Sequence, residues 1–359
     1  MIQTYKNYLI KLFLKKLLNI TIGFFCLIFI LNLFEEISFF KSQDTDFFLP
    51  FILTFLNTPA TIFDIFPFIF LIASQLFFIY LINKKELEIL KINGLSNLKI
   101  LKIISLTAFI CGIITIIVFY SVSSKMKFLY LDIKNNYSND NKYLAVITEN
   151  GLWLKDEIDE KILIINASKI LNDDLTNVEI TEFDRNFQLI RIITSEKVNI
   201  KNKIWLINNP IISTNNEVEI FKKNLSLNTH FDIQKINGLF RNLSSLNIIQ
   251  LIKLNNDYKS LGYATIDVKF HLNKIFSFPV YLSVMTLFAA IIMLNIKRNK
   301  PMIFHLILGI FLSVSVYYFY HLFGLFGKSE KIPLYFSIWL PLLILSIFIF
   351  IGLIRINEK

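Results

Sequence analysis

The stretch KKELEILKINGLSNLKILK, residues 84–102, lies between two long apolar runs and sets the organisation of the chain. It contains five lysines and two glutamates, whereas the flanking runs at 61–82 and 102–122 are strongly apolar. About 20 consecutive apolar residues are enough for a helix to cross the core of a bilayer. The stretch is therefore predicted to be a charged connector between two membrane spans.

The composition of the whole chain supports a membrane protein. Its 359 residues are 54% hydrophobic and include 37 Phe, which is too apolar for a water-soluble protein of this size. Further runs of spanning length lie at 14–36, 275–296, 302–323 and 333–354. We predict six spans in a 3+3 arrangement, and the first is too long in its apolar part to be a cleaved signal peptide.

The positive charge of the chain is concentrated on one side of the predicted membrane. The segments at 1–16, 83–102, 297–300 and 355–359 hold 14 basic and three acidic residues, and the rest holds 23 basic and 24 acidic residues. Basic residues accumulate in cytoplasmic loops. The net charge of +10 therefore predicts cytoplasmic termini in a bacterial inner membrane, with no role for nucleic acid.

The polar insert between spans three and four has the pattern of a β-domain. Short runs of alternating apolar and polar residues are separated by turn signals at Asn150-Gly151 and Asp184-Arg185-Asn186. This pattern predicts an antiparallel sandwich or open barrel in the periplasm. The expected organisation is spans one to three at 1–122 with a cytoplasmic helix at 84–94, the β-domain at 123–243, a connecting helix at 244–262, and spans four to six at 263–359.

The sequence offers little for chemistry of its own. GLFGKSE, residues 324–330, has two residues where a phosphate-binding loop needs four between its first glycine and GK[ST]. The cysteines, Cys26 and Cys111, lie in predicted spans, and no Cys/His cluster has metal-ligand spacing. The central part of each span lacks the charged groups that ion-driven transporters use. We therefore expect no enzyme activity, no metal and no cofactor, and energy from a partner if the chain transports a substrate.

The connector predicts an amphipathic helix that ends at Gly94. One face holds charged residues that can pair with each other, Lys84, Glu88 and Lys91. The opposite face is apolar but includes one acid: Leu87, Ile89, Leu90 and Glu86. This face either docks into a groove of another protein, where a cation meets Glu86, or lies on the bilayer with the carboxylate reaching the headgroups.

Several stretches resemble the LptF/LptG permeases of lipopolysaccharide exporters, and the G subunit most. They are ELEILKINGLS at 86–96, GLWLKD at 151–156, KIWLI at 203–207, LNKIFSFPVYLSVM at 272–285 and HLFG at 321–324. The resemblance covers essentially the whole length. It implies six transmembrane helices with an inserted periplasmic β-jellyroll, in a non-catalytic subunit of an ABC transporter that passes lipopolysaccharide toward the outer membrane.

The resemblance also implies partners and site residues. The partners would be an LptF-like paralogous permease, an LptB-like cytoplasmic ATPase dimer that binds the ATP, and an LptC-like single-span protein with its own jellyroll. The ATPase would dock on residues of the connector, namely Glu86, Leu87, Leu90, Lys91 and Gly94, with the acid meeting a basic residue.

Lipopolysaccharide would enter between spans one and five and contact Lys41, Phe311, Val314 and Tyr318. An aromatic stripe on a span also fits plain helix packing. The chain departs from the family near the outer end of span one, where Glu35 and Glu36 stand and Lys41 alone represents the expected lysines.

Two other functions are compatible with the same layout. One is a permease of another ABC-type exporter that moves a different amphiphile or a lipoprotein. The other is a membrane-anchored scaffold whose external β-domain binds a partner without transport. A paired paralogue favours the lipopolysaccharide exporter over the first alternative, and co-purification of an ATPase argues against the scaffold.

Overall fold

The computed structural model describes most of the chain: residues 2–41, 46–137, 152–158, 161–171, 173–214, 217–220, 224–233, 236, 239, 242–260, 263–295 and 301–357. The chain divides into two compact units. We name residues 1–127 and 266–359 the helical unit, and residues 128–265 the β unit.

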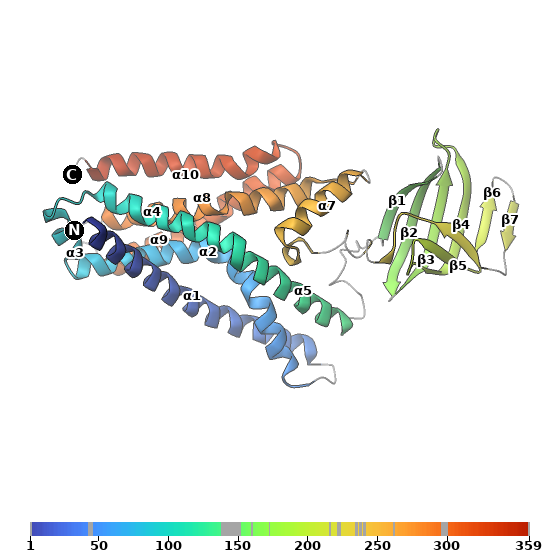
Figure 1. Cartoon of the computed structure of the whole chain (residues 1–359), viewed down its shortest axis with the longest axis horizontal. Coiled ribbons are helices and arrows are strands. Elements are labelled where there is room, and N and C mark those ends of the chain that lie inside the picture. The colour runs from blue at the N-terminus through green and yellow to red at the C-terminus, as the bar shows by residue number, and fades with distance from the viewer. Residues whose placement is uncertain are drawn as a thin grey trace. The chain divides into compact units, whose positions relative to one another are not determined.

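The helical unit is built from long apolar helices. They are α1 (Ile2–Phe40), α2 (Leu49–Asn83), the short α3 (Glu86–Ile92), α4 (Asn97–Ile114), the π-helical η1 (Thr115–Tyr120), α5 (Ser121–Asn136), α8 (Ile266–Leu294), α9 (Met302–Lys328) and α10 (Leu334–Asn357). The residues of α5 from 128 onward are counted in the β unit. The described residues contain six helices that are long and apolar enough to cross a membrane, with α4, η1 and α5 forming one of them. This confirms the six predicted spans. Figure 1 shows the ends marked N and C at the same end of this unit as α3.

The second span is much longer than its apolar run predicts, because α2 begins at Leu49 rather than near 61. Two threonines in the added turns donate to the carbonyl four residues earlier: Thr54 to Pro50 at 2.7 Å and Thr58 to Thr54 at 2.7 Å. Pro59 and Pro67 lie inside the helix. Prolines are tolerated within membrane helices when neighbouring groups satisfy the freed backbone.

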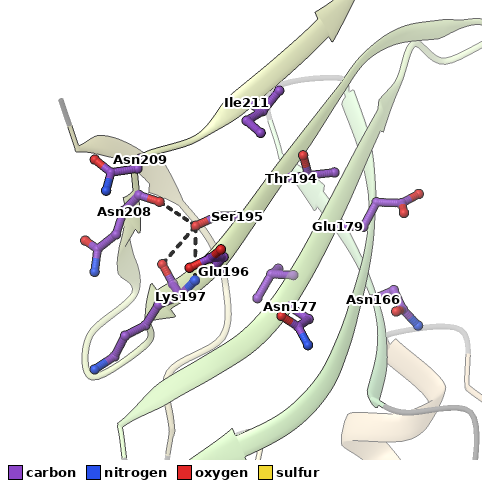
Figure 2. A pocket seen from close by; sticks show the side chains of 11 residues that line it. Asn166, Asn177, Glu179, Thr194, Ser195, Glu196, Lys197, Asn208, Asn209 and Ile211 are labelled. Carbon is purple, nitrogen blue, oxygen red and sulfur yellow. Dashed lines mark hydrogen bonds between the residues drawn. The ribbon is translucent and has the colours of Figure 1, made fainter. Parts of the chain in front are cut away.

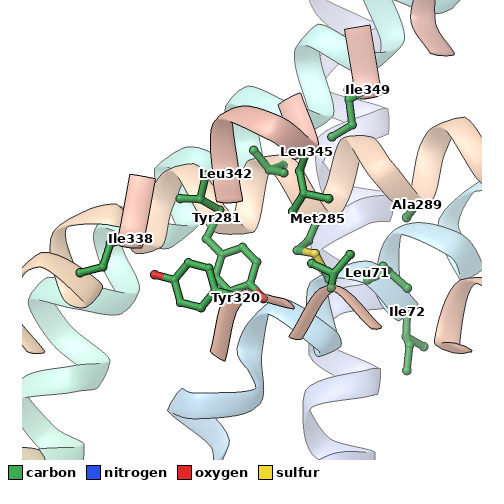
Figure 3. Packing of buried hydrophobic residues seen from close by; sticks show 12 residues of the cluster. Leu71, Ile72, Tyr281, Met285, Ala289, Tyr320, Ile338, Leu342, Leu345 and Ile349 are labelled. Carbon is green, nitrogen blue, oxygen red and sulfur yellow. The ribbon is translucent and has the colours of Figure 1, made fainter. Parts of the chain in front are cut away.

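A cluster of buried side chains from α2, α8, α9 and α10 forms a core of the helical unit (Figure 3). The rings of Tyr281 and Tyr320 stack within it, with centroids 4.9 Å apart. Elsewhere α4 approaches α8 closely at Gly112, where an added Cβ would lie 2.6 Å from the Cα of Pro279. Small residues at helix contacts allow such close backbone approach in membranes.

The β unit is a curled antiparallel sheet that forms a half-barrel. Its strands are β1 (Leu152–Ile158), β2 (Lys161–Leu171), β3 (Asp174–Phe183), β4 (Leu189–Asn199), β5 (Ile204–Asn208), β6 (Ile211–Thr214), β7 (Glu217–Ile220) and β8 (Leu225–Asn228). The order is β1-β2-β3-β4-β5-β8, with β6 also paired to β4 and then to β7. The predicted antiparallel β-domain is therefore confirmed for the strands from Leu152 to Asn228, whereas its predicted first residues, from 123 to 136, are helical and belong to α5.

One of the two predicted turns lies in the described part of the β unit. Between β3 and β4, the Asp184 carboxylate accepts the backbone N–H groups of Asn186 and Gln188, each at 2.8 Å. This closes the turn predicted from Asp184-Arg185-Asn186. The turn predicted at Asn150-Gly151 lies outside the described residues.

The interior of the β unit includes Trp205 of β5, which is fully buried. Its indole N–H donates to the backbone oxygen of Phe231 at 2.8 Å. Alternate residues of β1 and β3 also point inward, as expected for a sheet with one buried face. The same interior holds Glu182, whose carboxylate pairs with Arg191 at 2.7 Å.

The helix predicted after the sheet is present but shorter. A single 3-10 turn, η2 (Leu243–Ser245), precedes α7 (Ile248–Ser260). Asn247 caps α7 by accepting the N–H of Gln250 at 2.9 Å, and the Gln250 side chain accepts the N–H of Asn247 at 3.0 Å. This reciprocal pair is a capping box. The predicted end at Gly262 lies outside the described residues.

Candidate functional site

The connector folds as a short helix, a tight turn and the start of α4. The short helix, α3, begins only at Glu86 because Lys85 has a left-handed backbone, with φ of 56°. Gly94 ends it with φ of 83°, and the N–H of Leu95 donates to the carbonyl of Leu90 at 3.0 Å. Glycine adopts this conformation without the strain of a Cβ. Ser96 then caps α4 by accepting from the N–H of Lys99 at 3.4 Å.

The acid of the connector has a partner that lies far away in the sequence. The hydroxyl of Tyr8, near the start of α1, donates to Oε2 of Glu86 at 2.5 Å. The residue pattern of the connector alone does not indicate this tyrosine, which lies 78 residues earlier in the chain. The predicted topology places the first residues of the chain on the same side of the membrane as the connector, so a contact between them could have been expected.

The apolar residues of the connector divide differently from the prediction. Leu87 is 8% exposed and packs within this chain, and Leu90 is half-buried. Ile89 and Ile92 are instead 54% and 85% exposed. Lys91 and Gly94 are exposed. The most exposed apolar side chains of α3 are therefore those of the two isoleucines, and Leu90 is exposed only in part.

A second region of interest is an apolar cavity of about 270 Å³ between α2, α8 and α9. Its lining includes two of the predicted lipid contacts, Val314 and Tyr318, together with Phe68, Tyr281, Met285 and Tyr317. Phe311 is 68% exposed one turn earlier on α9 and is not among the lining residues. Lys41 lies exposed just after α1 and is not part of the cavity either.

Charged residues that the sequence analysis did not single out lie at this cavity. Asp64 lines it and binds the Lys274 ammonium at 2.9 Å. Close to the start of α8, Asp267 pairs with Lys328 at 2.9 Å. Glu36, one of the two acids by which the chain departs from the family near the outer end of span one, is only 1% exposed. The described ion pairs near this cavity and near the start of α8 are therefore formed by residues of α2, α8 and α9, and not by the charged residues at the end of span one.

A groove of about 770 Å³, lined mainly by polar side chains, lies on the sheet of the β unit (Figure 2). Strand register aligns Asn166, Glu179 and Thr194 across β2, β3 and β4. At one side, the hydroxyl of Ser195 donates to the backbone oxygen of Asn208, where the chain bends from β5 into β6. No sequence motif predicts this groove, because strand register and strand order bring its residues together.

No metal centre is found within the described ranges. There, no group of three or more His, Cys, Asp or Glu side chains is arranged to hold a metal ion. The two regions described in the helical unit instead offer an exposed apolar helix with a fixed carboxylate and a cavity suited to apolar ligands.

Comparison with known proteins adds the family. The family of the lipopolysaccharide export system permease LptF/LptG matches residues 7–355, essentially the whole chain. A search of curated proteins found no match. The matched segment covers the six apolar helices, the connector and the β unit. The chain therefore belongs to the LptF/LptG family of lipopolysaccharide export permeases, which are non-catalytic transmembrane components.

Proposed function

We propose that the protein is the permease subunit, of the G type, of an ATP-driven exporter. It extracts lipopolysaccharide from the inner membrane and passes it to a periplasmic bridge toward the outer membrane. The observation that carries this proposal is the family match over residues 7–355, joined to six apolar helices and an inserted β unit. In this proposal the β unit is a jellyroll that continues the lipid path, and a paralogous permease and a single-span jellyroll protein complete the assembly.

The connector is the proposed docking site for the cytoplasmic ATPase, which binds the ATP. Ile89 and Ile92 present apolar surface beside the charged Lys91 on α3, which joins α2 to α4. Exposed apolar residues with a polar surround are typical of protein interfaces. Glu86, held by Tyr8, supplies the acid that meets a basic residue of the ATPase.

The cavity is the proposed contact for the acyl chains of the lipid. Its aromatic and aliphatic walls suit apolar ligands, and the Asp64–Lys274 pair gives it one polar edge. Val314 and Tyr318 line it directly. In the same proposal Phe311 and Lys41 contact the lipid from the exposed surface, the first through its ring and the second through its charge.

The docking proposal is tested by purification of the tagged protein in mild detergent, wild type beside Glu86→Lys, with the bound proteins quantified. We expect the wild type to retain an ATPase and a paralogous permease. Glu86→Lys should lose the ATPase by roughly tenfold or more, since it places a like charge against the basic partner, and should keep the paralogue. Glu88→Lys, an exposed residue of the same helix, is the matched control and should retain both.

If no ATPase accompanies the wild type, the ATP-driven proposal fails and a scaffold becomes the better explanation. If Glu86→Lys and Glu88→Lys lose the ATPase equally, a general charge effect replaces specific docking.

The lipid proposal is tested by filling the cavity. Val314→Trp places a bulky ring in a space of about 270 Å³, and we expect less lipopolysaccharide to co-purify with the complex. Ile307→Trp, exposed on the same helix and outside the lining residues, should bind as the wild type does. Equal lipid content in both variants would contradict the proposal, and a different bound amphiphile would favour another type of exporter.

A further inference from the structure

The position of Tyr8 is fixed by the buried residues that follow it on α1. Leu9 and Phe13 are both fully buried. The ring of Phe13 packs edge-on against Phe70 and Phe77 of α2, with centroids 6.3 Å and 5.9 Å away. These contacts set the rotation of α1 about its axis. The Tyr8 hydroxyl is therefore presented to the connector by a rigid helix rather than by a loose terminus.

The Tyr8 hydroxyl donates a hydrogen bond to the carboxylate of Glu86, which is the first residue of α3. The helix is only seven residues long, and a helix of that length is not stable by its own backbone bonds. Leu87 anchors it through burial, and Glu86 anchors it to α1. A hydrogen bond to an ionised carboxylate is shorter and stronger than one between neutral groups.

We propose that Tyr8 is a positioning residue for ATPase docking. It holds the Glu86 carboxylate by Oε2, so that the other oxygen can accept from an ammonium or guanidinium group of the ATPase. This inference rests on the proposed docking role of Glu86. Because Tyr8 belongs to α1, the same bond ties the first membrane helix to the docking helix, and a movement that the ATPase imposes on α3 is passed to α1.

The test is a double-mutant cycle on the full-length protein purified with its associated ATPase. Tyr8→Phe removes one hydroxyl and keeps the ring, and Glu86→Gln keeps the shape of the side chain and removes its charge. We expect Tyr8→Phe to lower ATPase retention by roughly tenfold, the lower end of what a hydrogen bond to a charged group contributes. In the Glu86→Gln background, Tyr8→Phe should have no further effect, because the negative charge that Tyr8 positions for the basic partner is already absent.

Two further measurements separate positioning from folding. The amount of paralogous permease retained by Tyr8→Phe should equal that of the wild type, which a misfolded helical unit would not give. Tyr5→Phe removes a hydroxyl from the same helix at a half-buried residue and should leave ATPase retention unchanged.

The outcomes distinguish this inference from the function on which it rests. If Tyr8→Phe retains the ATPase fully while Glu86→Lys loses it, Tyr8 has no positioning role and the docking proposal stands. If the effects of Tyr8→Phe and Glu86→Gln are additive, the tyrosine acts independently of the acid and the inference is wrong. If Glu86→Lys also retains the ATPase, the docking proposal itself fails.

Discussion

The helical unit and the β unit bury their apolar residues by different rules. In α1 the most apolar window has a mean hydropathy of 2.4, yet only 6% of it is buried inside the protein. In β1 every second residue is buried and the residues between are exposed. Lipid solvates apolar side chains as well as a protein interior does, and water does not. Hydropathy therefore locates the helices of the helical unit without showing which residues are buried in the protein. In β1 of the β unit, by contrast, burial follows the alternation of residues along the strand.

This difference changes what stabilises each unit. Between membrane helices there is no hydrophobic driving force, so association depends on close packing and on a few polar bonds. In a domain surrounded by water, burial of apolar area is the main favourable contribution. Loss of a large buried side chain should therefore harm the β unit most, and loss of shape complementarity should harm the helical unit most.

The largest effect is expected at Trp205, which is fully buried in the β unit. Trp205→Ala leaves a cavity and also removes the 2.8 Å hydrogen bond that the indole donates to the Phe231 oxygen, which keeps its bond from Thr229. We expect a loss of about 3–5 kcal/mol in the stability of the β unit. Limited proteolysis of the full-length protein should show faster cleavage within residues 128–265.

Trp153→Ala provides the matched control. Trp153 is 53% exposed on β1, so its removal opens no comparable cavity and should change the cleavage rate little. Equal sensitivity of the two variants would contradict the view that burial stabilises the β unit.

A smaller effect is expected from Gly112→Ala in the helical unit. The added methyl group would lie 2.6 Å from the Cα of Pro279, so α4 and α8 must separate. Such overpacking costs about 1–3 kcal/mol. The measurement is the temperature at which the protein in detergent ceases to be monodisperse, which should fall.

Gly23→Ala is the control for that substitution. No atom lies within 4 Å of the Cβ position at Gly23, and alanine favours a helix over glycine by up to about 1 kcal/mol. Its thermal stability should equal or exceed that of the wild type. A fall of the same size in both variants would mean that glycine itself, rather than the helix contact, is required.

The sequence predicts those parts of the fold that depend on neighbouring residues. Six spans follow from hydropathy, and the turn at Asp184–Asn186 follows from a local side-chain bond. The length of α2 was missed because Thr54 and Thr58 sit in turns that hydropathy does not mark as a span. Helix length depends on backbone bonding, whereas hydropathy reports only the apolar part.

The sites divide in the same way. The connector is recognisable because its charges and Gly94 are consecutive in the sequence. The bond from Tyr8 to Glu86 joins residues 78 positions apart, and that from Lys274 to Asp64 joins residues 210 positions apart. Such pairs are created by helix packing, which periodicity in one segment cannot specify. The same reason separates Leu87, which is buried, from Ile89, which is exposed.

The smallest effect expected concerns a surface ion pair of the β unit. Burial alone would raise the pKa of Asp174, but hydrogen bonds from Lys197 at 3.0 Å and Asn199 at 2.7 Å outweigh it and hold that pKa below the ordinary value of 3.8. A carboxyl group whose pKa is lowered by folding stabilises the folded state above its unfolded pKa. That contribution is lost as the pH falls through the folded pKa.

Protease resistance of residues 128–265 at pH 7 and at about pH 3, measured with an acid-tolerant protease at the lower pH, checks this pH dependence. Asp174→Asn should make the stability of the β unit depend less on pH. The change should be less than about 1 kcal/mol, because Lys197 is 57% exposed. Lys197→Ala, which removes the partner and keeps the acid, should act in the same direction but less, since the Asn199 bond remains.

An unchanged pH dependence in Asp174→Asn would show that solvent screens the pair completely. The water-exposed unit would then depend on burial alone, as the comparison with Trp205 suggests for its interior.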